Sequence, residues 1–145
     1  MRGDECLSIY RRCSRFRDGY FASPARLVAA HDAPSYLYRF SYVMSLLQVR
    51  RPSATHGSEI PFVFESFTTP RLSDVDRRVQ TMMHGCWVAF AKTGKPECPG
   101  APAWPAYERA SDQRMVLDST PRVEKIPEGA VMDLLRATLD GGQRK

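Results

Sequence analysis

The stretch SYLYRFSYV, residues 35–43, constrains the fold more than any other part of this 145-residue chain. Its residues alternate, so that the aromatic side chains at positions 36, 38, 40 and 42 lie on one face of a β-strand and a mixed set lies on the other. A strand with one aromatic face needs neighbouring strands and covering helices. The segment therefore predicts one strand of a larger sheet in an α/β protein.

Other elements are predicted on both sides of this strand. Ser23 followed by Pro24 favours the start of a helix with Ser23 as N-cap, and Ser73 begins a long amphipathic helix that ends at Gly94. The remaining predictions are a loop over residues 44–57, short strands at 115–117 and 123–126, and an amphipathic helix at 130–139. Helices on both sides of a single strong strand indicate the last part of an α/β fold.

Composition limits the class of protein. The length is that of one domain, and 43% hydrophobic with 26% charged residues is typical of a globular chain. Residues 1–17 carry five arginines against two acidic residues, a net charge of +3, whereas residues 18–145 carry 16 basic and 14 acidic groups, a net charge of +2. A short basic leader followed by a nearly neutral body does not predict nucleic-acid binding. We expect an irregular leader at 1–17, one structured region at 18–140 and a frayed tail at 141–145.

The leader and the cysteines offer no targeting signal or metal site. An apolar stretch interrupted by Ser8 and Tyr10, with no small-residue cleavage site after it, does not predict a signal peptide, and no apolar run is long enough to span a membrane. A cytoplasmic location is therefore the default expectation. The four cysteines, at positions 6, 13, 86 and 98, form no C-x-x-C pair. We predict free thiols with Cys86 buried, and no metal or cofactor site.

Candidate catalytic chemistry centres on ATHGSEIPFVF, residues 54–64. His56 stands in a predicted loop just after the aromatic strand, and imidazole can accept and return a proton near neutral pH. His31, after the first helix, and His84, inside the long helix, are interpreted as structural. A serine nucleophile turn of the G-x-S-x-G type is absent, because no serine has glycine two residues before and two after it.

Four phrases in register carry a family resemblance. SYLYRFSYV, ATHGSEIPFVF, WVAFAKTGKP and WPAY occur in this order and resemble the C-terminal portion of the type-B carboxylesterases, the family that includes the cholinesterases. The resemblance covers Asp18 to Tyr107 well and Tyr107 to Lys145 more loosely, and the leader matches nothing in that family. It implies an α/β-hydrolase fold with a triad of serine, an acidic residue and histidine.

The resemblance assigns His56 as the catalytic histidine. It also implies that the nucleophile, the acid and the oxyanion hole belong to sequence upstream of Met1. Glu59 is expected to have a supporting or structural role, because a glutamate three residues along the same loop is poorly placed to meet the ring nitrogen opposite the serine. No cofactor is implied, and the substrate class is a small-molecule carboxylic ester.

The leading hypothesis is a C-terminal fragment of a carboxylesterase-like serine hydrolase, incomplete as a fold and inactive in isolation. Its parts would be one late strand of the central sheet, the histidine-bearing loop, the long helix, two short strands and a C-terminal helix. The alternative is a noncatalytic interaction module, or one chain of a split esterase. Such a chain would use an exposed sheet edge to bind a complementing N-terminal chain or to self-associate.

Overall fold

The computed structural model describes residues 21–31, 33–51, 53–68 and 71–127, together with positions 129, 133 and 137. Its elements in chain order are α2 (Ser23–Ala29), β1 (Tyr38–Phe40), the 3-10 helix η2 (Ser45–Leu47), α3 (Ile60–Val63), α4 (Asp74–Thr93), β2 (Gln113–Leu117) and β3 (Arg122–Lys125). The predicted leader, most of the predicted helix at 130–139 and the predicted tail lie outside the described residues.

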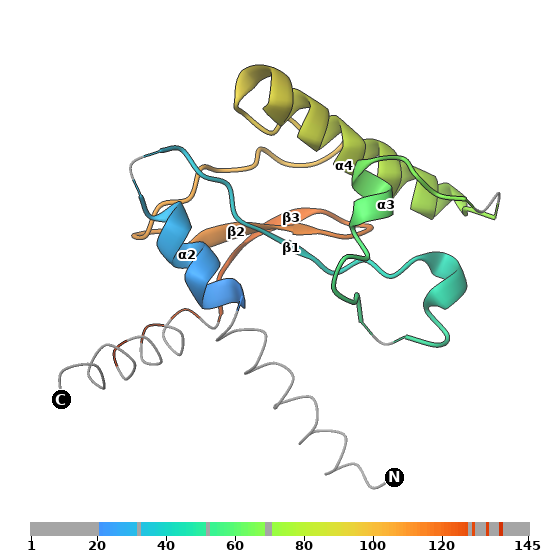
Figure 1. The fold of residues 1–145 in the computed structure, drawn as a ribbon, viewed down its shortest axis with the longest axis horizontal. Helices are drawn as coiled ribbons and strands as arrows, with labels where there is room; N and C mark the ends of the chain where they lie inside the picture. The colour runs from blue at the N-terminus through green and yellow to red at the C-terminus, as the bar shows by residue number, and fades with distance from the viewer. Residues whose placement is uncertain are drawn as a thin grey trace, which may run out of the picture.

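A three-stranded mixed sheet forms the centre of the fold, in the order β1-β2-β3. β1 pairs with β2 in parallel, with Tyr38 opposite Met115, and β2 pairs with β3 as an antiparallel hairpin. Figure 1 shows α2 on one side of the sheet and α3 and α4 on the other. Helices on both faces of a sheet that contains a parallel pair confirm the predicted α/β class.

The long helix α4 has the ends that the sequence predicts. Ser73 is its N-cap and forms a capping box with Asp76, in which each side chain accepts a hydrogen bond from the backbone N–H of the other residue. Gly94 ends the helix in the left-handed conformation, at φ 72°, which glycine adopts without a Cβ penalty. These two signals set the length of the helix, and the apolar stripe between them sets its buried face.

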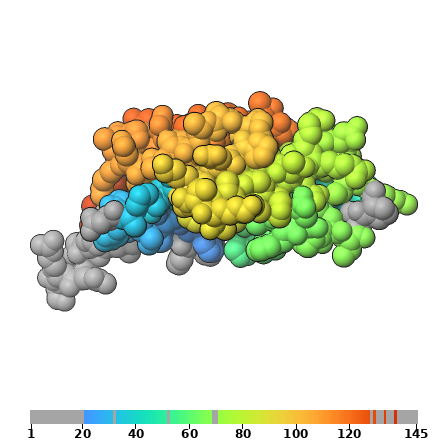
Figure 2. All heavy atoms as spheres, turned by 90° about the horizontal axis from the view of Figure 1, so that it is seen from above, coloured from blue at the N-terminus to red at the C-terminus, as the bar shows by residue number. Residues whose placement is uncertain are grey.

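The main core lies between this stripe and the aromatic face of the sheet. Its buried residues come from β1 and its extension, α3, α4 and β2: Tyr42, Phe62, Val63, Val79, Met82, Met83, Cys86, Met115 and Leu117. Phe62 is its aromatic centre, with ring centroids 5.6 Å from Phe40 and 4.7 Å from Phe67. Seen from above, α4, lime green to yellow, and the segment that follows it, yellow to orange, form a closely packed surface in Figure 2.

A smaller cluster of Ala29, Tyr107 and Ile126 covers the opposite face of the sheet. Beside it, the buried guanidinium of Arg26 on α2 donates to both carboxylate oxygens of Asp112, at 3.0 and 2.8 Å. Burial lowers the pKa of Arg26, but the hydrogen bonds and charge of Asp112 outweigh it and raise the pKa above its ordinary value. This ion pair attaches α2 to the start of β2.

Two local predictions are wrong in detail. The strand predicted at residues 35–43 is only three residues long in β1, although the backbone of Ser35 and Ser41 also bonds to the neighbouring segments. β2, its partner within the described residues, ends at Leu117 opposite Phe40, so the ladder stops there. Ser23 is the first residue of α2 rather than its N-cap, because Ala22 before it is already in the helical region.

The prediction of free thiols is wrong for two of the four cysteines. Cys86, which is fully buried on α4, forms a disulfide with Cys98, and their Cα atoms lie 4.3 Å apart. The chain reverses after Gly94 and returns along the helix, which brings together two residues twelve positions apart. No local pattern in the sequence signals that return path. Cys6 and Cys13 lie outside the described residues.

Candidate active site

His56 lies in a turn between the β1 segment and α3, as the sequence predicts. Two backbone hydrogen bonds shape the turn, from the N–H of Ser58 to the carbonyl of Thr55 at 3.1 Å and from the N–H of Ile60 to the carbonyl of Gly57 at 3.2 Å. Gly57 has φ 75°, a conformation that favours glycine directly after the histidine. The turn leaves the imidazole of His56 exposed.

A cavity of about 460 Å³ lies beside His56. Its wall comes from the start of α2, from β1 and β2, and from the His56 turn: Phe21, Ala22, Ala25, Tyr38, Arg39, Phe40, Ala54, Thr55, His56, Gly57, Glu59 and Arg114. The structure thus brings His56 and Glu59, the two candidate residues, to one hollow. The imidazole also stacks on the ring of Phe21, with centroids 6.0 Å apart and planes 29° from parallel.

The cavity lies along an open edge of the sheet. The carbonyl of Leu37 accepts from the N–H of Met115, and the N–H of Ser41 donates to the carbonyl of Leu117, both at 3.0 Å. These residues therefore face β2, and the backbone groups of Tyr38 and Phe40, which alternate with them, face the other way. Within the described part of the chain no strand pairs with β1 on that side.

Glu59 does not act as the acidic partner of the His56 ring in this structure. It is the half-buried residue just before α3, and no hydrogen bond joins it to His56 within the described residues. Its carboxylate contributes negative charge to the cavity instead. Burial raises the pKa of Tyr38 above its ordinary value, and the charge of Glu59 raises it further.

No described serine is hydrogen-bonded to the imidazole either. The nearest serine along the chain, Ser58, donates its hydroxyl to the carbonyl of Thr55 at 2.6 Å. Within the described residues, His56 therefore has neither of the two partners that a serine hydrolase needs. Both ring nitrogens remain available to groups from outside this part of the chain.

The other two histidines stand away from the cavity. Nδ1 of His84, on α4, is 2.8 Å from the carbonyl oxygen of Val63, and this contact fastens α3 to α4. His31 is exposed just past the end of α2. Neither lines the cavity beside His56.

Asp76 anchors the segment that leads to the His56 turn. This fully buried carboxylate accepts hydrogen bonds from the hydroxyl of Tyr42 at 2.6 Å, the backbone N–H of Ser45 at 2.9 Å and the hydroxyl of Ser73 at 2.8 Å. Burial raises the pKa of Asp76, but these donors more than compensate and hold it below its ordinary value. The network joins the end of the β1 segment to the first turn of α4.

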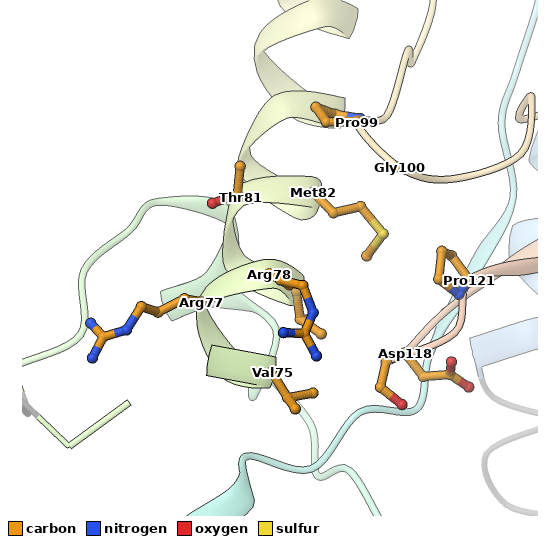
Figure 3. A pocket seen from close by; sticks show the side chains of 11 residues that line it. Val75, Arg77, Arg78, Thr81, Met82, Pro99, Gly100, Asp118 and Pro121 are labelled. Atoms are coloured by element: carbon orange, nitrogen blue, oxygen red, sulfur yellow. The ribbon is translucent and has the colours of Figure 1, made fainter. Parts of the chain in front are cut away.

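A second cavity, of about 450 Å³, lies between α4 and the turn that joins β2 to β3. Figure 3 shows Arg78 directed into it, with Asp118 on the far side and Arg77 turned away. No candidate catalytic residue lines it. Within the described residues there is no group of three or more histidine, cysteine, aspartate or glutamate side chains that could hold a metal ion, and no helix is both long and apolar enough to cross a membrane.

The sequence model of the carboxylesterase family matches residues 11–135, which is most of the chain. The chain belongs to the carboxylesterase family.

Similar carboxylesterases come from mammals and bacteria. The chain is 34% identical over 115 residues to the cocaine esterase of Homo sapiens, covering 73% of this chain and 20% of that protein. It is 32% identical over 133 residues to the para-nitrobenzyl esterase of Bacillus subtilis, covering 83% of this chain and 26% of that protein. A solved PNB esterase structure has a TM-score of 0.72 at 29% identity, over 86% of this chain and 26% of the solved chain.

The comparisons bear on the fold and on the extent of the chain. The α/β-hydrolase fold implied by the sequence resemblance is confirmed by the solved esterase structures that it matches. The chain spans only about a fifth to a quarter of the length of these relatives.

Sequence reasoning missed one neighbour of His56. Phe21 lies 35 positions upstream, outside any motif shared with the histidine, and α2 must fold back against the sheet to bring the two rings together. The basic residues Arg39 and Arg114 of the cavity were also not singled out. They belong to different strands, and only pairing of β1 with β2 places them near each other.

Proposed function

We propose that this chain is the C-terminal part of a carboxylic ester hydrolase and that His56 is the general base of its triad. The serine nucleophile, the acid and the oxyanion hole would come from polypeptide outside these 145 residues. The observation that carries the proposal is the position of His56, exposed in the turn after β1, beside a cavity along the open sheet edge. Membership of the carboxylesterase family supports ester hydrolysis as the reaction class.

The proposed chemistry follows from the imidazole. His56 would accept the proton of a serine hydroxyl as the oxygen attacks the ester carbonyl, and it would then return the proton to the departing alcohol oxygen. A water molecule would be activated in the same way to release the acid product. Glu59 would support the turn and add negative charge to the cavity without holding the imidazole.

An assay with a nitrophenyl ester tests this role. The isolated chain is expected to hydrolyse the ester no faster than an equal concentration of free imidazole, because a lone histidine supplies only general-base assistance. Addition of a second chain that carries the uncovered N-terminal part of a related esterase, or its fusion to Met1, should restore turnover. His56→Ala should then lower that turnover at least about 10³-fold, whereas His31→Ala, an exposed control, should leave it unchanged.

Two results would overturn the proposal. One is turnover by the isolated chain that disappears in His56→Ala, because the nucleophile would then lie within these residues. The other is restored turnover that survives His56→Ala, because the base would then lie elsewhere. DNA sequence upstream of the start codon offers an independent check, since an interrupted gene should encode a G-x-S-x-G segment there.

The open edge of β1 favours a second candidate, a noncatalytic binding module. The outward backbone groups of Tyr38 and Phe40 offer hydrogen bonds to an added strand, from a complementing chain or from a second copy. Light scattering over a concentration series, with and without the N-terminal chain, separates the cases. Stable association without any ester turnover supports the module, and turnover on association supports the hydrolase.

A further inference from the structure

The pair formed by Phe21 and His56 joins two segments that are far apart in the sequence. Phe21 lies two residues before the start of α2, and the residue is 57% exposed. Its ring centroid is 6.0 Å from that of His56, within the range of roughly 4.5–7 Å in which aromatic pairs interact. Both rings line the same cavity. Phe21 is therefore part of the immediate surroundings of the proposed general base.

The geometry of the contact suits a base that must keep both nitrogens free. Hydrogen bonds to Nδ1 and Nε2 lie in the plane of the imidazole, one toward the acid and one toward the serine. Phe21 meets the ring at 29° from parallel, so it occupies a face and not an edge. A phenyl ring carries no hydrogen-bonding group, so it contacts the imidazole without engaging either nitrogen.

Little else in the described residues holds the imidazole. His56 stands in an exposed turn, and no hydrogen bond reaches its ring nitrogens within the part of the chain that the structure describes. A histidine side chain that is free to rotate spends only part of its time in a productive orientation, and misplacement of a reacting group by about 1 Å can lower a rate about 10²-fold. A ring stacked on the imidazole, as that of Phe21 is, would limit that rotation.

We propose that Phe21 is a positioning residue, which holds the imidazole of His56 in one orientation by contact with its face. This inference rests on the proposed role of His56, but its test does not need catalysis. The side-chain rotamer of His56 can be measured by NMR in the isolated chain, from the three-bond couplings between its Hα and Hβ protons. His31 and His84 serve as references in the same spectra.

Three variants make the test specific. Phe21→Leu removes the aromatic face and keeps an apolar side chain, Phe21→Tyr keeps the face, and Phe64→Leu removes a phenylalanine that is 71% exposed and does not line the cavity. The wild-type chain should show one dominant rotamer of His56. Phe21→Leu should average the couplings and move the ring protons of His56 downfield by loss of the ring current. Phe21→Tyr and Phe64→Leu should keep the wild-type values.

The proposal is overturned if His56 is already averaged in the wild-type chain, or if Phe21→Leu leaves its couplings unchanged. If Phe21→Leu fails to fold, as judged by the signals of His84, Phe21→Met replaces it with the same expected outcome. If the ester assay fails while the couplings of His56 respond to Phe21→Leu as expected, the proposed hydrolysis is contradicted, and the positioning of His56 by Phe21 is not. In a restored hydrolase, Phe21→Leu should lower kcat about tenfold or more at unchanged KM, with rescue by Phe21→Tyr.

Discussion

The hydroxyl of Tyr42 donates a 2.6 Å hydrogen bond to the buried carboxylate of Asp76, and so joins the end of the β1 segment to the first turn of α4. The same carboxylate caps the helix through Ser73 and holds the backbone of Ser45. One charged group thereby aligns the strand, the helix and the start of the loop that leads to His56. An uncompensated charge in this position would be costly, and these donors stabilise it.

Asp76 should make the stability of the chain depend on pH in the acid range. Its folded pKa lies below the ordinary value of 3.8, so the unfolded chain binds more protons in that window and stability rises with pH there. The contribution is present above about pH 4 and is lost as the pH falls through the folded pKa. The free energy of unfolding, measured in urea from pH 2 to 6, should depend less on pH in Asp76→Asn than in the wild-type chain. Asp74→Asn, an exposed neighbour in the same helical turn, should keep the wild-type slope.

The disulfide between Cys86 and Cys98 should contribute about 2–4 kcal/mol to the free energy of unfolding. Cys98→Ser should lower the free energy of unfolding measured in urea by that amount, and dithiothreitol should bring the wild-type chain to the same value without affecting the variant. The double variant Cys6→Ser/Cys13→Ser provides the control, and it should remain sensitive to the reductant. An unfolding midpoint of the wild-type chain that is indifferent to dithiothreitol would contradict the assignment.

Removal of one member of the buried pair of Arg26 and Asp112 should destabilise the chain more than replacement of both residues by apolar ones. Among the described residues, Arg26→Met leaves the buried Asp112 carboxylate with the 2.9 Å hydrogen bond from Tyr107 as its one side-chain donor, and it should destabilise the chain by about 3–5 kcal/mol. The double variant Arg26→Met/Asp112→Leu should recover much of that loss. Thermal unfolding of both measures the difference. A double variant no more stable than Arg26→Met alone would contradict this expectation.

Gly94 should be sensitive to substitution for a purely conformational reason. Its φ of 72° is unfavourable for other residues, yet a Cβ built there meets no atom within 4 Å. Gly94→Ala should therefore destabilise the chain by about 1 kcal/mol, and Gly94→Asn by less, because asparagine tolerates the left-handed region. Chemical denaturation followed by the fluorescence of Trp87 and Trp104 would measure both. Equal stability of all three chains would show that the helix does not end in this way.

Several elements were predictable because their causes are local. The capping box at Ser73, the left-handed Gly94 and the apolar stripe between them are set by neighbouring residues along one helix. The two strands β2 and β3 were placed to within two residues at each end, since a Pro-containing turn separates them, whereas their pairing as a hairpin came from the structure. The turn that carries His56 was also predicted from residues close to it in the chain. Its catalytic assignment and the role of Glu59 remain predictions.

The sequence by itself determined the class of fold, the long helix and the position of His56 in a turn after a strand. Periodicity, capping and glycine conformation act over a few residues, and all of them can be seen in one linear stretch. Only the tertiary structure decided that Cys86 pairs with Cys98, that Arg26 pairs with Asp112 and that Phe21 stacks on His56. The chain must reverse direction or dock a helix on the sheet to create these contacts, because each partner lies beyond the range of any local pattern.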